Sequence, residues 1–111
     1  MAFTKLCKLD DVWEGEMESF EVNGIEVVVT CNEGGEFKAY QATCPHQDIP
    51  LIEGKFDGKT LICRAHQWVF DARTGKGINP ADCALASYPI KVEGDDVMID
   101  TVGIEPLFAH S

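Results

Sequence analysis

The sequence has no long apolar run and little positive charge. No stretch approaches the roughly 20 apolar residues of a membrane-spanning helix, and residues 1–5 lack the charged-then-apolar pattern of a signal peptide. We therefore expect a cytoplasmic protein without a membrane partner. Lys and Arg number 9 against 19 Asp and Glu, a formal net charge of -10. This balance excludes a nucleic-acid binder, because such proteins neutralise phosphates with basic side chains.

The acidic side chains are concentrated between residues 10 and 36, where the sequence has no Lys or Arg. One interpretation is a solvated face that keeps a small protein soluble. The other is electrostatic steering toward basic partner proteins, which raises encounter rates without requiring tight binding. The same charge pattern serves both purposes.

Cysteine is present in an odd number, five, and a reducing compartment argues against a disulfide framework. Cys7, Cys31 and Cys83 have no partner at metal-ligand spacing, and we expect them to be core or near-surface thiols. A length of 111 residues predicts a single domain, 1–111, and no repeat or linker interrupts it.

The remaining cysteines lie in two short Cys-and-His pairs. The pattern is C-x-H, then sixteen residues, then C-x2-H, formed by Cys44, His46, Cys63 and His66. Structural zinc fingers usually pair like ligands with like. A 2Fe-2S cluster with one iron on two cysteines and the other on two histidines instead needs one ligand of each kind from each loop. The pattern therefore favours this cluster, with a zinc-binding structural or interaction module as the alternative.

The residues around these pairs resemble the two cluster-binding loops of Rieske ferredoxins. The matching segments are Cys44-Pro45-His46-Gln47, the run 63–71, Thr74-Gly75 and Asn79-Pro80. Residues 9–13 and 77–80 also look similar to the ferredoxin of multicomponent toluene (aromatic) monooxygenases. The resemblance covers nearly the whole chain. It implies one Rieske 2Fe-2S cluster, held by loops of about residues 43–50 and 62–70, with both histidines on the outer iron.

The resemblance also implies an electron carrier. Such a ferredoxin passes single electrons from a flavin- or iron-sulfur-containing NAD(P)H reductase to the hydroxylase of a toluene-type monooxygenase, or alternatively to a ring-hydroxylating dioxygenase. We expect a monomer that is not itself an enzyme. A Rieske oxygenase needs a second iron held by two His and a carboxylate, and only His110 remains. Residues 75–80 end in Pro where a dinucleotide-binding G-x-G-x-x-G has Gly.

The expected reduction potential is low for a Rieske centre. High-potential respiratory Rieske proteins have a disulfide between the loops and a Ser hydroxyl near the cluster, at the positions that Ile49, Ala65 and Trp68 occupy here. Fewer hydrogen bonds to the cluster sulfurs favour the oxidised form. We expect a midpoint of roughly -150 mV, the low end for such centres.

Four side chains near the ligands are interpreted from their residue types. Arg64 is the only charged residue within the ligand motifs, and it is either a partner contact or simply solvated. Trp68 is expected to pack under its loop. Gln47 and Gln67, which each follow a ligand histidine, are expected to face solvent.

Periodicity predicts an all-β fold. Short strands are expected over residues 17–22, 25–30, 37–42, 59–62, 68–70, 88–93 and 96–100. Asn23-Gly24 and Gly94-Asp95 are typical hairpin turns, and Asp10 is a candidate cap for a helical turn over residues 10–13. The pattern is typical of an antiparallel β-sandwich or small barrel. The family resemblance adds a small cluster-binding subdomain formed by the two loops.

Overall fold

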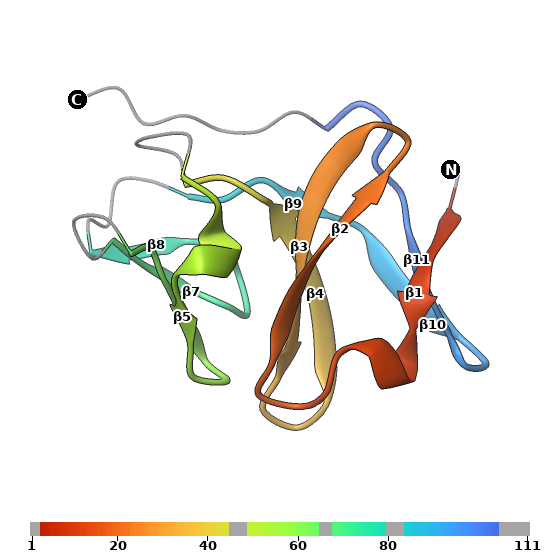
Figure 1. Ribbon diagram of the computed structural model, residues 1–111, viewed down its shortest axis with the longest axis horizontal. Helices are drawn as coiled ribbons and strands as arrows, with labels where there is room; N and C mark the ends of the chain where they lie inside the picture. The colour runs from red at the N-terminus through yellow and green to blue at the C-terminus, as the bar shows by residue number, and fades with distance from the viewer. Residues whose placement is uncertain (1–2, 45–48, 65–67, 80–83, 105–111) are drawn as a thin grey trace.

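The computed structural model describes residues 3–44, 49–64, 68–79 and 84–104, and it is built from antiparallel β-sheets (Figure 1). Its strands are β1 (Thr4–Lys8), β2 (Met17–Val22), β3 (Ile25–Asn32), β4 (Glu36–Gln41), β5 (Lys55–Phe56), β6 (Thr60–Ile62), β7 (Val69–Asp71), β8 (Gly77–Asn79), β9 (Ser87–Tyr88), β10 (Ile90–Glu93) and β11 (Asp96–Ile99). Two short 3-10 turns, η1 (Leu9–Asp11) and η2 (Leu51–Glu53), interrupt them. The predicted all-β class is confirmed.

The strands form three sheets with the orders β1-β11-β10, β2-β3-β4-β9 and β5-β6-β7-β8. In Figure 1 the β2–β9 sheet stands in the middle, with β5–β8 on one side and β1, β10 and β11 on the other. We call the β5–β8 sheet with η2 the small subdomain, and the other two sheets the base. The predicted division into a base and a small subdomain therefore matches the arrangement of the sheets.

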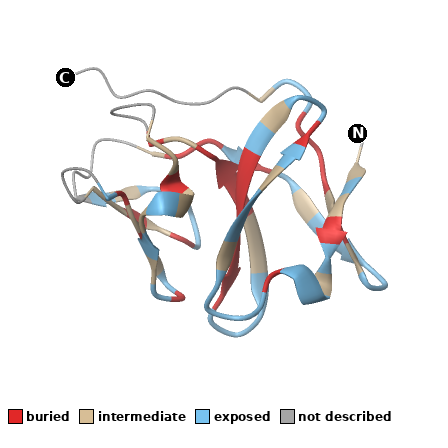
Figure 2. Cartoon of the chain, in the orientation of Figure 1, coloured by how far each residue is buried: buried red, intermediate tan, exposed pale blue. Residues whose placement is uncertain are grey.

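Strand β3 of the middle sheet is buried on both faces over most of its length, which explains its continuous β-branched run. Val28 packs with Tyr40 in a core shared with the small subdomain. Val27 and Val29, which point the opposite way because side chains alternate along a strand, pack with Ile99 in a second core inside the base. Figure 2 shows the buried residues gathered along this middle sheet. Two hydrophobic cores thus meet at one sheet.

The two hairpin turns form as the sequence predicts. Asn23 and Gly24 have φ values of 54° and 77° between β2 and β3, as a tight turn with two left-handed residues requires. Gly94, with φ of 62°, turns β10 into β11. The predicted strand over residues 88–93 is wrong in one respect, because Pro89 divides it between two sheets. Proline has no N–H for the sheet ladder.

The helical turn lies one residue earlier than expected, and its cap is different. The 3-10 turn covers Leu9–Asp11, and Asp11 accepts a hydrogen bond from the Lys8 N–H at 2.9 Å. Asp10 was therefore the wrong choice of cap. Trp13, which follows the turn, is 64% exposed. Among the described residues, no helix is long and apolar enough to cross a bilayer.

Candidate metal centre

Cys44 and Cys63 are the two predicted ligands that the structure describes. Cys44 follows β4 and Cys63 follows β6, so each is delivered at a strand end. Both are fully buried, and both belong to the core that contains Leu51 and Phe70. His46 and His66 lie outside the described residues. The structure therefore brings the two thiols to one part of the interior, as a shared site requires.

The loops that follow these cysteines are closed in the same way. The Cys44 N–H donates to the Ile49 carbonyl at 3.0 Å, and the Cys63 N–H donates to the Trp68 carbonyl at 2.8 Å. In each case the cysteine bonds to the residue five positions later. In the sequence, each predicted histidine therefore lies between two residues that are hydrogen-bonded to each other. The two Cys-and-His pairs differ in spacing, but their loops are closed by equivalent backbone hydrogen bonds.

The described part of the site suits an iron-sulfur cluster. Thiolates are the ligands that iron-sulfur clusters require, and two of them lie in one core on separate, closed loops. Among the described residues there is no group of three or more His, Cys, Asp and Glu that could hold a metal ion. Of the four predicted ligands, the structure therefore describes the two thiols, Cys44 and Cys63.

A buried glutamine supports the first loop. Gln41, 1% exposed at the end of β4, donates from Nε2 to the Thr43 carbonyl at 2.8 Å and accepts at Oε1 from the Ala86 N–H at 2.7 Å. The Leu51 N–H donates to the Ala42 carbonyl at 2.8 Å on the far side of the loop. Gln41 therefore ties the start of the first loop to the chain that returns toward β9.

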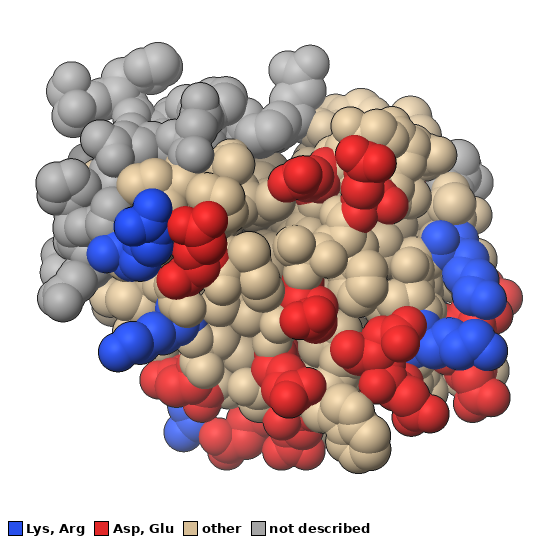
Figure 3. All heavy atoms as spheres, in the orientation of Figure 1, with Lys and Arg blue, Asp and Glu red and all other residues tan. Residues whose placement is uncertain are grey.

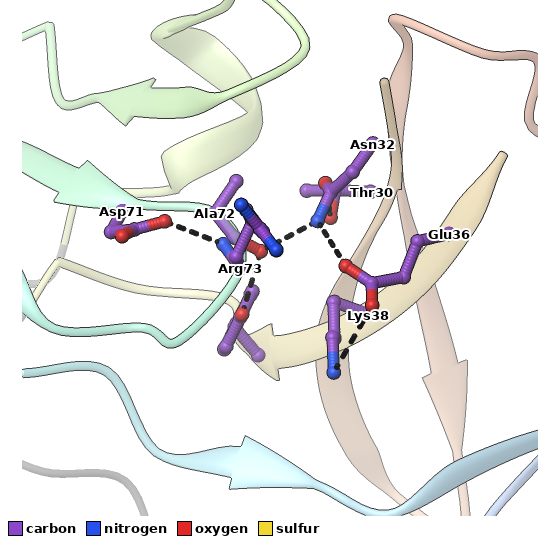
Figure 4. A network of polar contacts seen from close by, with 8 residues as sticks. Thr30, Asn32, Glu36, Lys38, Asp71, Ala72 and Arg73 are labelled. Carbon is purple, nitrogen blue, oxygen red and sulfur yellow. Dashed lines mark hydrogen bonds and ion pairs between the residues drawn. The ribbon is translucent and has the colours of Figure 1, made fainter. Parts of the chain in front are cut away.

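A single carbonyl in the turn after β7 fixes the small subdomain to the base. The Ala72 carbonyl accepts from the Tyr40 hydroxyl at 2.7 Å. It also accepts from the Asn32 amide nitrogen at 2.9 Å (Figure 4). Burial, and then the negative charges of Asp71 and Glu36, raise the pKa of Tyr40, so its hydroxyl remains a donor. Two side chains from the base thus hold the turn after β7, the strand that follows the second loop.

Glycine at position 75 makes room for this contact. A Cβ there would lie 2.9 Å from a ring carbon of Tyr40, and the φ of Gly75 is 79°. Both the space and the backbone conformation therefore require glycine.

An ion pair joins the chain segments that carry the two loops. Arg64 directly follows Cys63, and its Nε lies 2.7 Å from Oε1 of Glu53 in η2. From the sequence, Arg64 was expected either to contact a partner protein or to be solvated. The structure shows an exposed side chain engaged within the protein. Glu53, Tyr40, Asn32 and Gln41 were all missed by the sequence reasoning, because no local spacing signals contacts across so many residues.

Two of the positions at which high-potential proteins have a disulfide or a hydroxyl, Ile49 and Trp68, are described by the structure. Ile49 and Trp68 are partly buried and pack against the core that holds both cysteines. Trp68 also lies 6.5 Å from Phe70, centroid to centroid, so its predicted packing role is confirmed. The backbone N–H groups of Cys44 and Cys63 already donate within their loops. Ala65, Gln47, Gln67 and Pro80 lie outside the described residues.

The other cysteines behave as small hydrophobes where the structure describes them. Cys7 and Cys31 are 5% and 4% exposed, and both are free thiols. Burial, and then the negative charge of Asp11, raises the pKa of Cys7 to about 11. The expectation of buried thiols is confirmed for these two, while Cys83, like His110, lies outside the described residues.

Comparison with known proteins identifies a Rieske domain that covers most of the chain. The sequence profile of the Rieske [2Fe-2S] domain matches residues 2–89. The chain is 48% identical over 107 residues to the "Alkene monooxygenase system, ferredoxin component" of Xanthobacter autotrophicus, covering 95% of this chain and 84% of that one. It is 44% identical to the "Biphenyl 2,3-dioxygenase, ferredoxin component" of Rhodococcus jostii, covering 93% and 96%.

A solved structure shares the fold. A chain of the "Complex of reduced oxygenase and oxidized ferredoxin in carbazole 1,9a-dioxygenase" superposes with a TM-score of 0.77 at 26% identity, covering 87% of this chain and 91% of that one. The profile match covers the segments that contain Cys44 and Cys63. The two thiols lie in one core. The cofactor that the family indicates is a Rieske-type 2Fe-2S cluster. The chain belongs to the Rieske [2Fe-2S] domain family.

Proposed function

We propose that this chain is the electron-carrying ferredoxin of a multicomponent monooxygenase. It accepts single electrons from an NAD(P)H-dependent reductase and passes them to a hydroxylase that oxidises a hydrocarbon, of the toluene type in our sequence-based prediction. The observation that carries the proposal is the 48% identity, along nearly the whole chain, to the ferredoxin component of an alkene monooxygenase system. The protein is a carrier rather than an enzyme.

Cys44, His46, Cys63 and His66 are the proposed ligands. When bound, a Rieske cluster supplies a one-electron redox centre that is easier to reduce than an all-cysteine one. The chain supports it through two closed loops, each with one thiol that is buried in the core. Gln41 fixes the first loop, and Tyr40 with Asn32 fixes the turn that follows the second. Rigid support of this kind keeps a redox site in one geometry.

The reductase and the hydroxylase are proposed to use one docking face. The three sheets share two cores, and no linker separates them among the described residues, so we do not expect the cluster loops to swing between two proteins docked at the same time. The ferredoxin must therefore shuttle between them as a cytoplasmic monomer. Its net charge of -10 favours brief, electrostatically guided encounters with basic surfaces. In Figure 3 acidic side chains dominate the visible face of the base, which supports steering as well as solubility.

Competition between the partners tests this proposal. Redox-inactive hydroxylase is titrated into an assay in which the reductase reduces the ferredoxin, at low and at high salt. Mutually exclusive docking requires that the hydroxylase inhibits ferredoxin reduction, and steering requires faster transfer at low salt. Undiminished reduction in the presence of a stable ternary complex would contradict the shared docking face.

A dioxygenase partner is the second candidate, because the chain is also 44% identical to a ferredoxin component of a biphenyl 2,3-dioxygenase. Reconstitution separates the two. The reduced protein is mixed with a di-iron monooxygenase hydroxylase or with a Rieske ring-hydroxylating oxygenase, and the rate of electron transfer is measured with aromatic and alkene substrates. Faster turnover with the monooxygenase supports the first proposal, and faster turnover with the dioxygenase replaces it.

A further inference from the structure

The contact between Glu53 and Arg64 connects the two loops at a point outside the proposed cluster ligands. Glu53 ends the 3-10 turn that follows the first loop, and Arg64 stands next to Cys63 at the start of the second. Their side chains meet at 2.7 Å between Oε1 and Nε. Both are about half exposed, 48% and 59%, so solvent screens the attraction. The geometry is nevertheless that of a direct, charge-assisted hydrogen bond.

The backbone beside this pair is in close contact as well. A Cβ on Gly54 would lie 1.9 Å from the Ile62 carbonyl oxygen and 3.3 Å from the Arg64 nitrogen. The φ of Gly54 is -88°, so lack of space, and not a left-handed conformation, requires glycine here. The chain leaving the first loop therefore rests directly on the chain entering the second. The ion pair and the backbone contact are two independent signs of one junction.

We propose that Glu53, Gly54 and Arg64 form a noncovalent brace that holds the two cluster loops together, with Arg64 as a positioning residue for the second loop. The proposal rests on Cys44 and Cys63 as cluster ligands. The brace links the loops noncovalently, and it places one positive charge beside Cys63.

Two consequences distinguish a brace from an ordinary surface ion pair. Opening of either loop releases the cluster, so removing either partner accelerates cluster loss. Exposed ion pairs contribute at most about 1 kcal/mol, which corresponds to about a two- to fivefold change in rate. The charges act in opposite directions on the reduction potential, because reduction adds negative charge. Glu53→Gln leaves Arg64 uncompensated and raises the midpoint, whereas Arg64→Gln lowers it.

The pair formed by Lys91 and Glu93 provides a matched control. It lies on β10, on the base side of the molecule, with a separation of 2.6 Å and exposed fractions of 46% and 59%. Glu93→Gln and Lys91→Gln therefore make the same changes of net charge as Glu53→Gln and Arg64→Gln. Any effect of net charge alone appears equally in both sets.

The test measures bleaching of the visible absorbance of the holoprotein in excess iron chelator, together with midpoint potentials. We expect about two- to fivefold faster cluster loss in Glu53→Gln and in Arg64→Gln, no further increase in the double variant, and no change in the controls. Rates equal to those of the controls, or a double variant that multiplies the two single effects, would overturn the brace. Midpoint shifts that are absent or of the same sign would overturn the placement of the Arg64 charge.

The experimental results distinguish failure of the brace proposal from failure of the ligand assignment. All five brace and control variants retain Cys44 and Cys63 and are expected to assemble a cluster, so its rate of loss and its midpoint potential are compared. If the ligand assignment were wrong, replacing either cysteine would leave the cluster intact, whatever the behaviour of the brace variants.

Discussion

Removal of the Tyr40 hydroxyl should loosen the small subdomain by a predictable amount. In Tyr40→Phe the Ala72 carbonyl loses the donor at 2.7 Å but keeps Asn32 at 2.9 Å. The cost is therefore that of one buried hydrogen bond, about 1 kcal/mol, without the penalty of an orphaned carbonyl. Local opening should become about fivefold more frequent, in the segments held through the Ala72 peptide.

The double variant sharpens the argument. Asn32→Ala removes the second donor and also the acceptor of the buried Thr30 hydroxyl, so it should cost about 2–3 kcal/mol alone. Combined with Tyr40→Phe, it leaves the Ala72 carbonyl with neither donor. The double variant should then exceed the sum of the single costs by about 1 kcal/mol or more, the cost of a buried unsatisfied group.

Native-state hydrogen exchange followed by mass spectrometry is the appropriate assay, because it reports local opening without unfolding the whole protein. The informative peptides cover residues 59–62 and 69–77, since the Ala72 N–H donates to Lys59 and the Gly75 N–H to Asp71. Tyr88 supplies the control. Its hydroxyl is buried and has no hydrogen-bond partner among the described residues, so Tyr88→Phe should not accelerate exchange. Equal effects of the two substitutions would refute the role of the Ala72 contact.

The remaining predictions concern the cysteines and the potential. Cys44→Ser or Cys63→Ser should abolish most cluster assembly, seen as loss of iron, sulfide and visible absorbance, whereas the buried nonligand Cys31→Ser should retain all three. The pKa of Cys7 is raised to about 11 from 9.0, so stability should decline as pH rises through that interval, and urea denaturation at several pH values should show a smaller decline in Cys7→Ala. A redox titration should give a midpoint of roughly -150 mV that hardly changes with pH near neutrality. A clearly positive value would contradict the argument from Ile49, Ala65 and Trp68, which stand where high-potential proteins have a disulfide and a hydroxyl.

The strands that are most regular in sequence were predicted well. The segment 17–22 alternates and is followed by Asn23-Gly24, so both its register and its turn follow from local rules. The β-branched run of β3 was recognised as a strand. Its burial on both faces was not predicted, because the two cores are formed by residues far apart in the sequence. The strands β1, β5 and β8 were missed, because short edge strands have too few residues to show a period.

The ligand prediction depends on local chemistry, whereas the contacts that support the loops do not. A Cys and a His in one short segment indicate a site by residue type alone. The contacts that position the loops join residues 32 and 40 to 72, 41 to 86, and 53 to 64. Such pairs become neighbours only through the topology of the sheets. Polar residues such as Asn32 and Gln41, which are usually exposed, gave no sign that they would be buried.

The most direct test of the ligand set is electron–nuclear double resonance on the reduced holoprotein with nitrogen-15-labelled histidine. The sequence contains three histidines, so His110→Gln leaves only His46 and His66. We expect hyperfine coupling from two histidine nitrogens in both the wild type and this variant, with loss of one coupling in His46→Cys or His66→Cys where a cluster still forms. A colourless zinc protein, or a 2Fe-2S signal without histidine coupling, would contradict the assignment of Cys44, His46, Cys63 and His66.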